Sequence, residues 1–449
     1  MTRLTCLLGL LAAGVVLRAQ PPASVPQQPT DVSTTISSDQ SGTAPRFAVP
    51  AFVPLSTDPA VVDAAATIGR VLWDDLAFER EFALIPRDVA ATVPATRSTT
   101  DVAFDRWREL NADGVVIGTV SAANGGIRVE VRAFNVRGRQ SVFAREYTGP
   151  TANRRLYAHT IADELHEQQR ALRGVARTRL TFNSDRDGER MTGTIQDRGV
   201  KEIYIADYDG ENQRRVTTQR SLNITSTWSP DARSIAYTSY RRGTPTIFIA
   251  NIYQGTMEEP VPAQGQNWLP AWSPDGSRLA FSSTRDGNAE IYLVNRDGSG
   301  LRRLTNHPAI DSTPTWAPSG TQIAFTSDRS GTPQIYVVGT DGLGLRQVTR
   351  ESYADRPTWS PAPFNEIAYT ARTGPGNDIK ILELATGQVR QLTFGEGTNE
   401  SPSFAGNGRH LAFMSTRAGK AQIFTIGRDG KGLRQVTRTG NNYQPDWSK

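Results

Sequence analysis

The sequence is poor in cysteine, with one among 449 residues. That residue, Cys6, precedes the apolar run 7–17 of a predicted export signal, which begins with the positive Arg3 and ends at the small-residue cleavage site Leu17-Arg18-Ala19. The run is too short to span a bilayer. A lipoprotein signal would place its cysteine at the cleavage site, whereas Cys6 is lost with the signal. We therefore expect an exported protein without disulfides or thiol chemistry.

The sequence also lacks a strong charge of either sign. Its 50 Lys and Arg residues nearly balance 45 Asp and Glu residues, and the net charge of +5 falls to +3 when Arg3 and Arg18 leave with the signal. No block of five or more basic residues occurs, so nucleic acid is not expected as a partner. Its 39 Gly and 27 Pro residues indicate many turns between short elements, which favours a β-rich protein of two or three domains.

Motifs for catalysis or metal binding are incomplete. The stretch His166 to Arg170 starts like a zinc-binding helix, but Arg170 replaces its second histidine. The stretch Asn183 to Gly188 starts like a calcium loop, but Thr194 stands where a bidentate Glu is needed. No serine-hydrolase elbow or phosphate-binding loop is present. We therefore predict no enzymatic activity, cofactor or metal site, and structural roles for the four histidines, His159, His166, His307 and His410.

Residue composition and hydrophobic pattern divide the chain into three segments after the signal. Residues 20–45 are rich in Pro, Gln, Ser and Thr and predict a flexible arm. Residues 46–174 alternate strands and helices and predict an α/β domain. Its expected elements include a strand at 47–53, a helix from Pro59 with Val62 and Leu72 among its apolar positions, a hairpin at Asn124-Gly125-Gly126, and a helix at 152–172 that carries Leu156, Ala158, Ile161 and Leu165 on one side.

Residues 175–449 carry a repeat of 43 to 45 residues. Each repeat predicts four short strands and contains an aromatic anchor, and this period is typical of a β-propeller blade. The chain enters at a second strand and leaves with a first strand, so the last strand is expected to complete the first blade and close a ring of six. The anchors are Trp228, Trp272, Trp316, Trp359, Phe404 and Trp447.

The motif Trp-Ser-Pro-Asp-Gly at Trp272 to Gly276 recurs in degraded forms along this repeat. Pro presets the backbone of a tight turn, Asp and Gly suit its later positions, and Trp can pack between blades. Similar Asp-Gly turns at Asp209, Asp297, Asp341 and Asp429 should lie on the same face of the propeller. We interpret all of them as turn chemistry and not as an active loop.

An arginine follows the second strand of every repeat, at Arg186, Arg242, Arg285, Arg329, Arg372 and Arg417. These residues should ring the face opposite the Asp-Gly turns. Two interpretations stay open: each Arg binds carboxylates or carbonyls of the adjoining blade, or Arg242, Arg285, Arg329, Arg372 and Arg417 form a basic rim for an acidic partner.

The whole arrangement resembles one family. The segments LNADGVVIGTV (Leu110 to Val120), LYAHTIADEL (Leu156 to Leu165), GVARTRLTF (Gly174 to Phe182) and IADYDGENQ (Ile205 to Gln213) are similar to segments of TolB proteins, the periplasmic components of the Tol-Pal envelope system. The resemblance implies a fold with an α/β N-terminal domain and a six-bladed β-propeller. It also implies a periplasmic, non-enzymatic scaffold for outer-membrane integrity and constriction at division, present as a monomer within a complex.

The resemblance further implies two partners. TolA would bind the N-terminal arm through Asp31, Val32 and Ile36, with the two apolar residues as anchors of an added strand. A Pal-type peptidoglycan-associated lipoprotein would bind the propeller, in the loops that enter the anchors. An exported propeller that binds or cleaves a saccharide or peptide in its central funnel is the alternative. The residues expected at the lipoprotein are Gln266, Asn267, Leu269, Asp311, Ser312, Thr313, Tyr353, Asp355, Arg356, Asn399 and Glu400.

Overall fold

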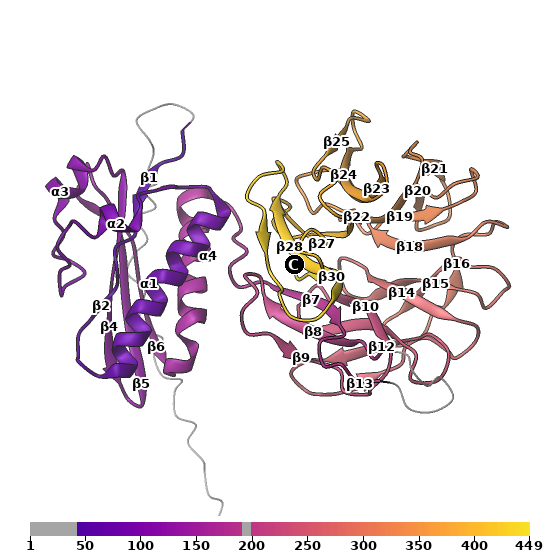
Figure 1. The fold of residues 1–449 in the computed structure, drawn as a ribbon, viewed down its shortest axis with the longest axis horizontal. Coiled ribbons are helices and arrows are strands. Elements are labelled where there is room, and N and C mark those ends of the chain that lie inside the picture. The colour runs from indigo at the N-terminus through magenta and orange to yellow at the C-terminus, as the bar shows by residue number, and fades with distance from the viewer. Residues whose placement is uncertain (1–42, 191–198) are drawn as a thin grey trace, which may run out of the picture.

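The computed structural model describes residues 43–190 and 199–449. The predicted signal peptide, Asp31, Val32, Ile36 and Thr194 lie outside the described residues. The chain forms an α/β domain and a six-bladed β-propeller, as the sequence predicts (Figure 1). Within the described ranges, none of the helices combines the length and the apolar character that a membrane crossing requires.

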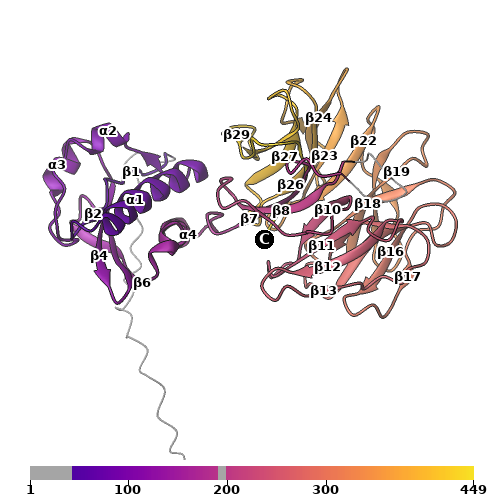
Figure 2. The same cartoon turned by 60° about the horizontal axis from the view of Figure 1, so that its bottom comes forward.

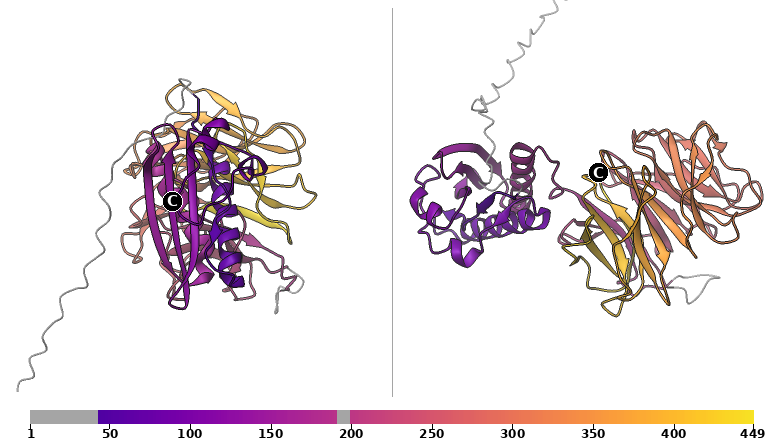
Figure 3. Two further views of the ribbon diagram at one scale, coloured as in Figure 1. Left: turned by 90° about the vertical axis from the view of Figure 1, so that its left-hand side faces the viewer. Right: turned by 90° about the horizontal axis from the view of Figure 1, so that it is seen from above.

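The α/β domain is built on one mixed sheet with the strand order β3-β1-β4-β5-β6, in which β2 also pairs with β4. Helices α1 and α4 cover the face of the sheet that lies toward the propeller (Figures 1 and 3). Helices α2 and α3 lie over the other face. The elements are β1 (Arg46–Ala48), β2 (Val53–Pro54), α1 (Pro59–Glu79), β3 (Ala83–Leu84), α2 (Arg87–Ala90), α3 (Phe104–Glu109), β4 (Gly114–Ala123), β5 (Gly126–Asn135), β6 (Gln140–Gly149), a 3-10 turn (Thr151–Asn153) and α4 (Arg154–Arg170).

Local sequence explains where α1 begins and ends. The Asp58 carboxylate accepts a hydrogen bond from the Ala60 amide at 2.9 Å, and Pro59 takes the first helical position. The helix ends at Arg80, which is in the left-handed conformation. Not every residue of the predicted apolar helix faces is buried, since Val62 is 42% exposed and Leu156 on α4 is 49% exposed.

The strand expected at 47–53 is also wrong in extent. It is split into the short strands β1 and β2, and Pro50, which has no amide hydrogen for the sheet, lies between them. Strand β6, the edge strand of the sheet, was not predicted because its burial pattern is irregular.

The propeller consists of six four-stranded antiparallel sheets. Blade 1 has the order β30-β7-β8-β9, and each later blade is continuous in sequence. The strands are β7 (Arg179–Ser184), β8 (Glu202–Asp207) and β9 (Arg214–Arg215) in blade 1; β10 (Asn223–Trp228), β11 (Ser234–Ser239), β12 (Thr246–Asn251) and β13 (Met257–Glu258) in blade 2; β14 (Asn267–Trp272), β15 (Arg278–Ser283), β16 (Glu290–Asn295) and β17 (Arg302–Arg303) in blade 3; β18 (Asp311–Trp316), β19 (Gln322–Ser327), β20 (Gln334–Gly339) and β21 (Arg346–Gln347) in blade 4; β22 (Ala354–Trp359), β23 (Glu366–Arg372), β24 (Asn377–Glu383) and β25 (Val389–Gln391) in blade 5; and β26 (Asn399–Phe404), β27 (His410–Ser415), β28 (Gln422–Gly427) and β29 (Arg434–Gln435) in blade 6, with β30 (Asn442–Trp447) returning to blade 1.

The last strand closes the ring, as the sequence predicts. Strand β30 pairs with β7 in an antiparallel register that sets Trp447 opposite Leu180 and Asn442 opposite Ser184. Closure removes two sheet edges that would otherwise be free to pair with another chain. All six aromatic anchors are buried, at 1% to 6% exposure.

The Trp-Ser-Pro-Asp-Gly motif forms a tight turn between the first two strands of a blade. The Ser273 hydroxyl accepts a hydrogen bond from the Arg278 amide at 2.9 Å, and the Gly276 amide donates to the Ser273 carbonyl at 2.9 Å. Gly276 has φ 71°, which glycine adopts without steric cost. The motif therefore has a structural role, as the turn that connects β14 to β15.

The end of α1 joins the two domains (Figure 2). Phe78 stacks on His410 of blade 6 at 4.5 Å between ring centroids and lies 4.9 Å from Tyr208 of blade 1. The buried Asp75 carboxylate accepts from the Tyr208 hydroxyl at 2.7 Å and contacts His159 Nδ1 at 2.8 Å. One apolar core consequently runs through both domains.

Two of the Asp-Gly turns, predicted only as turns, also bind the α/β domain. Asp209 in blade 1 forms an ion pair with Arg155 of α4, and Asp429 in blade 6 forms one with Arg80 at 2.8 Å. The face that bears these turns is therefore the one against the α/β domain. The opposite face, where the inner strands begin, is left open by the fold.

Candidate partner-binding face of the propeller

A ring of strained residues surrounds the channel along the propeller axis. The third residue of each inner strand has a positive φ between 49° and 57° although none of them is glycine. The strand register shifts at the same place in all six blades. Non-glycine residues in this region cost about 1 to 3 kcal/mol each and gather at functional sites. The six are Thr225, Leu269, Thr313, Arg356, Ser401 and Gln444.

These residues line a channel of about 150 Å³. The next two residues of each inner strand line it too, and the half-buried Asp446 lies among them. Burial raises the pKa of Asp446, while the Trp228 amide at 2.7 Å and the Ser403 hydroxyl at 3.0 Å hydrogen-bond to its carboxylate. The Asp446 carboxylate therefore links β30 to the neighbouring inner strands β10 and β26.

The structure corrects the placement of three expected contact residues. Asn267, Asp311 and Asn399 are the first residues of β14, β18 and β26, not loop residues, and each is at most 1% exposed. Their side-chain oxygens accept hydrogen bonds from arginines of their own blades: Arg285 at 2.8 Å, Arg329 at 2.7 Å and Arg417 at 3.0 Å, respectively. Their side chains therefore have almost no exposed surface.

The other expected contact residues lie at this end of the propeller with part of their surface accessible. Gln266 is exposed, and seven others are half-buried: Leu269, Ser312, Thr313, Tyr353, Asp355, Arg356 and Glu400. Within this set the Asp355 carboxylate accepts from the Tyr353 hydroxyl at 3.0 Å and from the Arg356 amide at 2.7 Å. The structure therefore brings Leu269, Thr313 and Arg356 together at the channel.

The arginines have a structural role, as the first of the two interpretations holds, but within their own blades and not on the adjoining blade. Arg285 donates through Nε to the Ser283 hydroxyl at 3.0 Å and lies over the ring of Tyr292 at 5.0 Å. Arg186, Arg329 and Arg417 repeat both contacts in their blades. Their guanidinium groups are thus held by their own blades.

Arg242 and Arg372 do not lie beside a serine hydroxyl of the second strand as the other four arginines do. In blade 2 the hydrogen bond to the serine hydroxyl comes from the amide of Arg241, while the exposed Arg242 pairs with Glu259. In blade 5 Ala371 replaces the serine, and the exposed Arg372 lies over Tyr353 at 5.1 Å. A regular basic rim of all the expected arginines is therefore not formed.

Sequence reasoning missed the apolar residues of this face. Ile310, directly before β18, is 54% exposed, and Phe394, in the loop before β26, is 74% exposed. Trp268 is the second residue of β14 and is half-buried. The signal available in the sequence was a large apolar residue in the loop before an anchor strand. These side chains add apolar area to a face whose charged groups are mostly paired.

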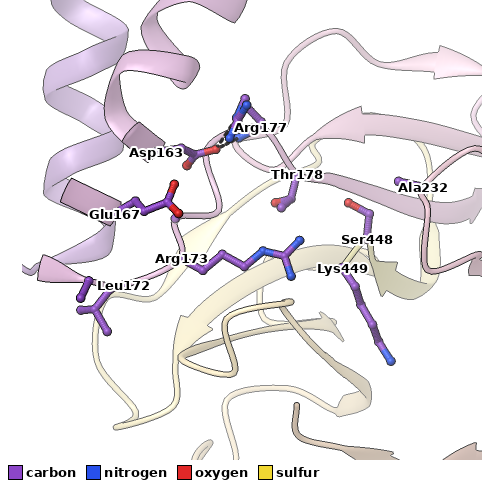
Figure 4. A pocket seen from close by; sticks show the side chains of 11 residues that line it. Asp163, Glu167, Leu172, Arg173, Arg177, Thr178, Ala232, Ser448 and Lys449 are labelled. Atoms are coloured by element: carbon purple, nitrogen blue, oxygen red, sulfur yellow. Dashed lines mark hydrogen bonds and ion pairs between the residues drawn. The ribbon is translucent and has the colours of Figure 1, made fainter. Parts of the chain in front are cut away.

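A second concavity lies between α4, the connection to β7 and the propeller (Figure 4). Its volume is about 680 Å³, and none of the expected site residues lines it. The Asp163 carboxylate at its edge accepts from the Ala176 amide at 2.8 Å and from Arg177 Nε at 2.9 Å. Glu167, Arg173 and Lys449 add charges of both signs to its lining.

Metal ligands do not gather in the described parts of the chain. Across residues 43–190 and 199–449 no three His, Cys, Asp or Glu side chains are grouped as a metal ion would need. Burial lowers the pKa of His166 to about 4 and that of His410 to about 3, so both are neutral at pH 7. His166 packs against Phe82 and His410 against Phe78.

The fold and this face define a class of protein: an α/β domain attached to one face of a six-bladed propeller whose other face is open. The family model for the TolB amino-terminal domain matches residues 23–142, and that for the TolB beta propeller domain matches residues 167–449. The chain belongs to the TolB family.

Known proteins agree with this membership. The chain is 33% identical over 146 residues to the Tol-Pal system protein TolB of Desulfosudis oleivorans, covering 32% of this chain and 33% of that protein. It is 30% identical over 147 residues to that of Pseudomonas fluorescens, covering 29% and 34%. The matched segments span about a third of the length of these relatives. The crystal structure of TolB from Acinetobacter baumannii matches with a TM-score of 0.77 and 25% identity, over 90% of this chain and 97% of that one.

Proposed function

We propose that this protein is a periplasmic scaffold of a Tol-Pal system. The open face of the propeller would bind a Pal-type peptidoglycan-associated lipoprotein, and the arm around Asp31, Val32 and Ile36 would bind TolA. Through these contacts the protein would support outer-membrane integrity and constriction at division, as a monomer within the complex and without catalysis. The proposed segments are a signal peptide at 1–19, the arm at 20–45, the α/β domain at 46–174 and the propeller at 175–449.

One observation carries the proposal. In a member of the TolB family, the fold covers one face of the propeller with the α/β domain and leaves the other with a strained ring, a channel and exposed apolar side chains. Exposed apolar groups beside polar ones are typical of protein-binding surfaces.

The partners are tested by crosslinking in intact envelopes followed by purification of this protein and mass spectrometry. A Pal-type lipoprotein and TolA should be recovered. Recovery of neither, with the protein present and folded, would contradict the scaffold. The arm is tested separately by deleting residues 31–42, which should remove TolA and leave the lipoprotein bound.

The binding face makes a sharper prediction. Leu269→Arg and Ser312→Arg should each weaken binding of the soluble lipoprotein domain by about tenfold or more, because a bulky charge replaces a small or apolar contact. Folding should be unaffected, because large side chains already stand at the equivalent positions of other blades. Arg356 of blade 5 is equivalent to Leu269, and Trp268 of blade 3 is equivalent to Ser312. Titration calorimetry measures the binding, and thermal unfolding measures the stability.

Leu343→Arg is the matched control. Leu343 is 71% exposed and lies in the turn after β20, on the face of the Asp-Gly turns. This variant should bind like the wild type. Equal losses of binding for all three variants, or a loss of stability that parallels the loss of binding, would show that the open face is not the docking surface.

A further inference from the structure

One kind of connection recurs at the open face, between the outer strand of one blade and the inner strand of the next. In five of these connections a buried threonine is followed by one exposed residue. The threonine hydroxyl accepts from the amide of an isoleucine near the start of the third strand. It donates to the acidic or amide side chain just before that isoleucine. The exposed residues, here called the edge residues, are Thr218, Asn306, Arg350, Phe394 and Arg438.

The backbone around Phe394 is held on both sides by the carboxylate of Asp378, which is 1% exposed. Thr393 Oγ1 donates to Asp378 Oδ1 at 2.7 Å, and the Gly395 amide nitrogen lies 3.0 and 3.1 Å from the two carboxylate oxygens. The side chain of Phe394 itself is 74% exposed. The fold thus presents a large apolar side chain from a fixed piece of backbone. Such a residue loses less conformational entropy on binding than one in a loose loop.

Phe394 has a basic edge residue on each neighbouring connection. Arg350 lies in the connection from blade 4 to blade 5, and Arg438 lies in the one from blade 6 to blade 1. Both are exposed, and within residues 43–190 and 199–449 neither guanidinium forms a hydrogen bond or an ion pair. The edge residues of the other two connections, Thr218 and Asn306, are uncharged. One side of the open face therefore carries the order basic, aromatic, basic.

The acids of these three connections do not compensate the two edge arginines. Glu351 pairs with Lys380 at 3.0 Å, and Glu396 pairs with Arg417 at 3.1 Å. The connection that holds Arg438, residues 436–441, contains no acid. The charges of the edge arginines are therefore left for a partner.

Side chains beside these connections add to the positive charge. Arg372 in blade 5 and Lys420 in blade 6 are exposed, and in the described parts of the chain neither forms an ion pair. Of the acids near the starts of β22 and β26, Asp355 pairs with Arg356 at 3.9 Å, and Glu400 has no cation within ion-pair distance among the described residues. Cations thus exceed acids on this side of the face, which suits an acidic surface.

We propose that Phe394, Arg350 and Arg438 recognise an acidic protein surface: Phe394 enters an apolar pocket of the partner, and the two arginines bind carboxylates beside that pocket. Aromatic and arginine side chains are enriched among the residues that carry most of the binding energy of protein interfaces. The partner is the lipoprotein, so this assignment rests on the proposed function. One aromatic residue on a fixed backbone suits a shaped pocket better than a lipid surface, which accepts a flexible side chain equally well.

Titration calorimetry with the soluble lipoprotein domain tests the aromatic residue. Phe394→Ala should weaken binding by about tenfold or more and leave the melting temperature unchanged, because the side chain is exposed. Leu343→Ala is the matched control, since Leu343 is 71% exposed on the opposite face, and it should bind like the wild type. Equal affinities of Phe394→Ala and the wild type would overturn the proposal.

The arginines are tested by charge reversal. Arg350→Glu and Arg438→Glu should each weaken binding by about tenfold, and the double variant should lose most of the salt dependence of the association rate. Arg346→Glu is the control, because Arg346 is exposed on the outer strand β21 of blade 4 and should not contact the partner. Association rates at low and high salt measure the effect. The same salt dependence in the wild type and the double variant would overturn the role of the arginines.

Co-sedimentation with phosphatidylglycerol vesicles distinguishes a membrane from a protein partner. The wild type should not bind these vesicles. Vesicle binding that is lost in Phe394→Ala, with an unchanged affinity for the lipoprotein, would assign the edge residues to a membrane surface and overturn the proposal. Lipoprotein binding that none of the edge variants changes would overturn this assignment alone. No lipoprotein binding by the wild type would contradict the proposed function and, with it, this assignment.

Discussion

At the scale of single residues, the aromatic anchors differ in how they join blades. Trp316 Nε1 donates to the Ala271 carbonyl of the preceding blade at 3.0 Å, and Arg278 lies over the Trp316 ring at 4.8 Å. Trp272 is equally buried, but its Nε1 has no hydrogen-bond partner among the described residues. The anchors therefore share an apolar role, to which Trp316, Trp359 and Trp447 each add a hydrogen bond from the indole nitrogen.

Two substitutions separate these contributions. Trp316→Phe should lower the free energy of unfolding by about 1 kcal/mol beyond its small volume change, the net value of one hydrogen bond. Trp316→Ala should lower it by about 3 to 5 kcal/mol, because it leaves a cavity between blades 3 and 4. Urea unfolding measures both. A loss for alanine no larger than that for phenylalanine would mean that packing does not hold this seam.

Residue roles within the repeat could be predicted only to within one position. The sequence indicates an arginine after each second strand, yet Arg241 and not Arg242 lies beside the serine in blade 2. Neighbouring arginines cannot be told apart by type, and a shift of one residue along a strand turns a side chain to the other face. The burial of Asn267 and Asp311 has the same origin, because the start of an inner strand looks like a loop in the sequence.

At the scale of elements, repeats were predictable and irregular connections were not. Six copies of one pattern locate the propeller strands and the ring closure, while β6 and the break between β1 and β2 occur once and have no second copy for comparison. Helix α4 shows a related limit: its spacing suggests an apolar side for Leu156, but within residues 43–190 and 199–449 that side chain is left 49% exposed. Packing partners far apart in the sequence decide such positions.

The last turn of α1 is the element that couples the domains. Phe78 is 7% exposed, and its ring touches His410, Tyr208 and the guanidinium of Arg434. Phe78→Ala should cost about 3 to 5 kcal/mol and should split a single calorimetric transition into separate transitions for the α/β domain and the propeller. Phe78→Leu should retain most of the coupling. One unchanged transition in the alanine variant would show that other contacts join the domains.

At the scale of the whole molecule, a buried acid makes the joint between the domains sensitive to pH. The Glu79 carboxylate accepts from the Val175 amide at 2.7 Å and from Arg409 of blade 6 at 2.8 Å. Burial raises the pKa of Glu79 from its ordinary value of 4.5 to about 7, against the opposing effect of Arg409. A protonated Glu79 is thus favoured by the folded state and not by the unfolded chain.

The sign of the effect follows from proton binding. Between pH 4.5 and about 7 the folded protein holds a proton on Glu79 that the unfolded chain has released, so this residue's contribution to stability falls as the pH rises. His166 and His410 act in the opposite direction, because their pKa values are lowered and the unfolded chain binds their protons first. The contribution of Glu79 is therefore obtained by subtracting the free energy of unfolding of the wild type from that of a Glu79 variant at each pH.

Glu79→Gln provides that difference. The glutamine keeps an oxygen for the Val175 amide, and Arg409 keeps Glu81 as a partner at 3.3 Å. The free energy of unfolding of the variant minus that of the wild type should increase by up to about 3 kcal/mol between pH 4.5 and 7, at about 1.4 kcal/mol per unit of pKa shift. Urea titrations across this range measure it. A constant difference would show that Glu79 is already ionised at pH 4.5 and that its ion pair with Arg409 outweighs burial at the joint.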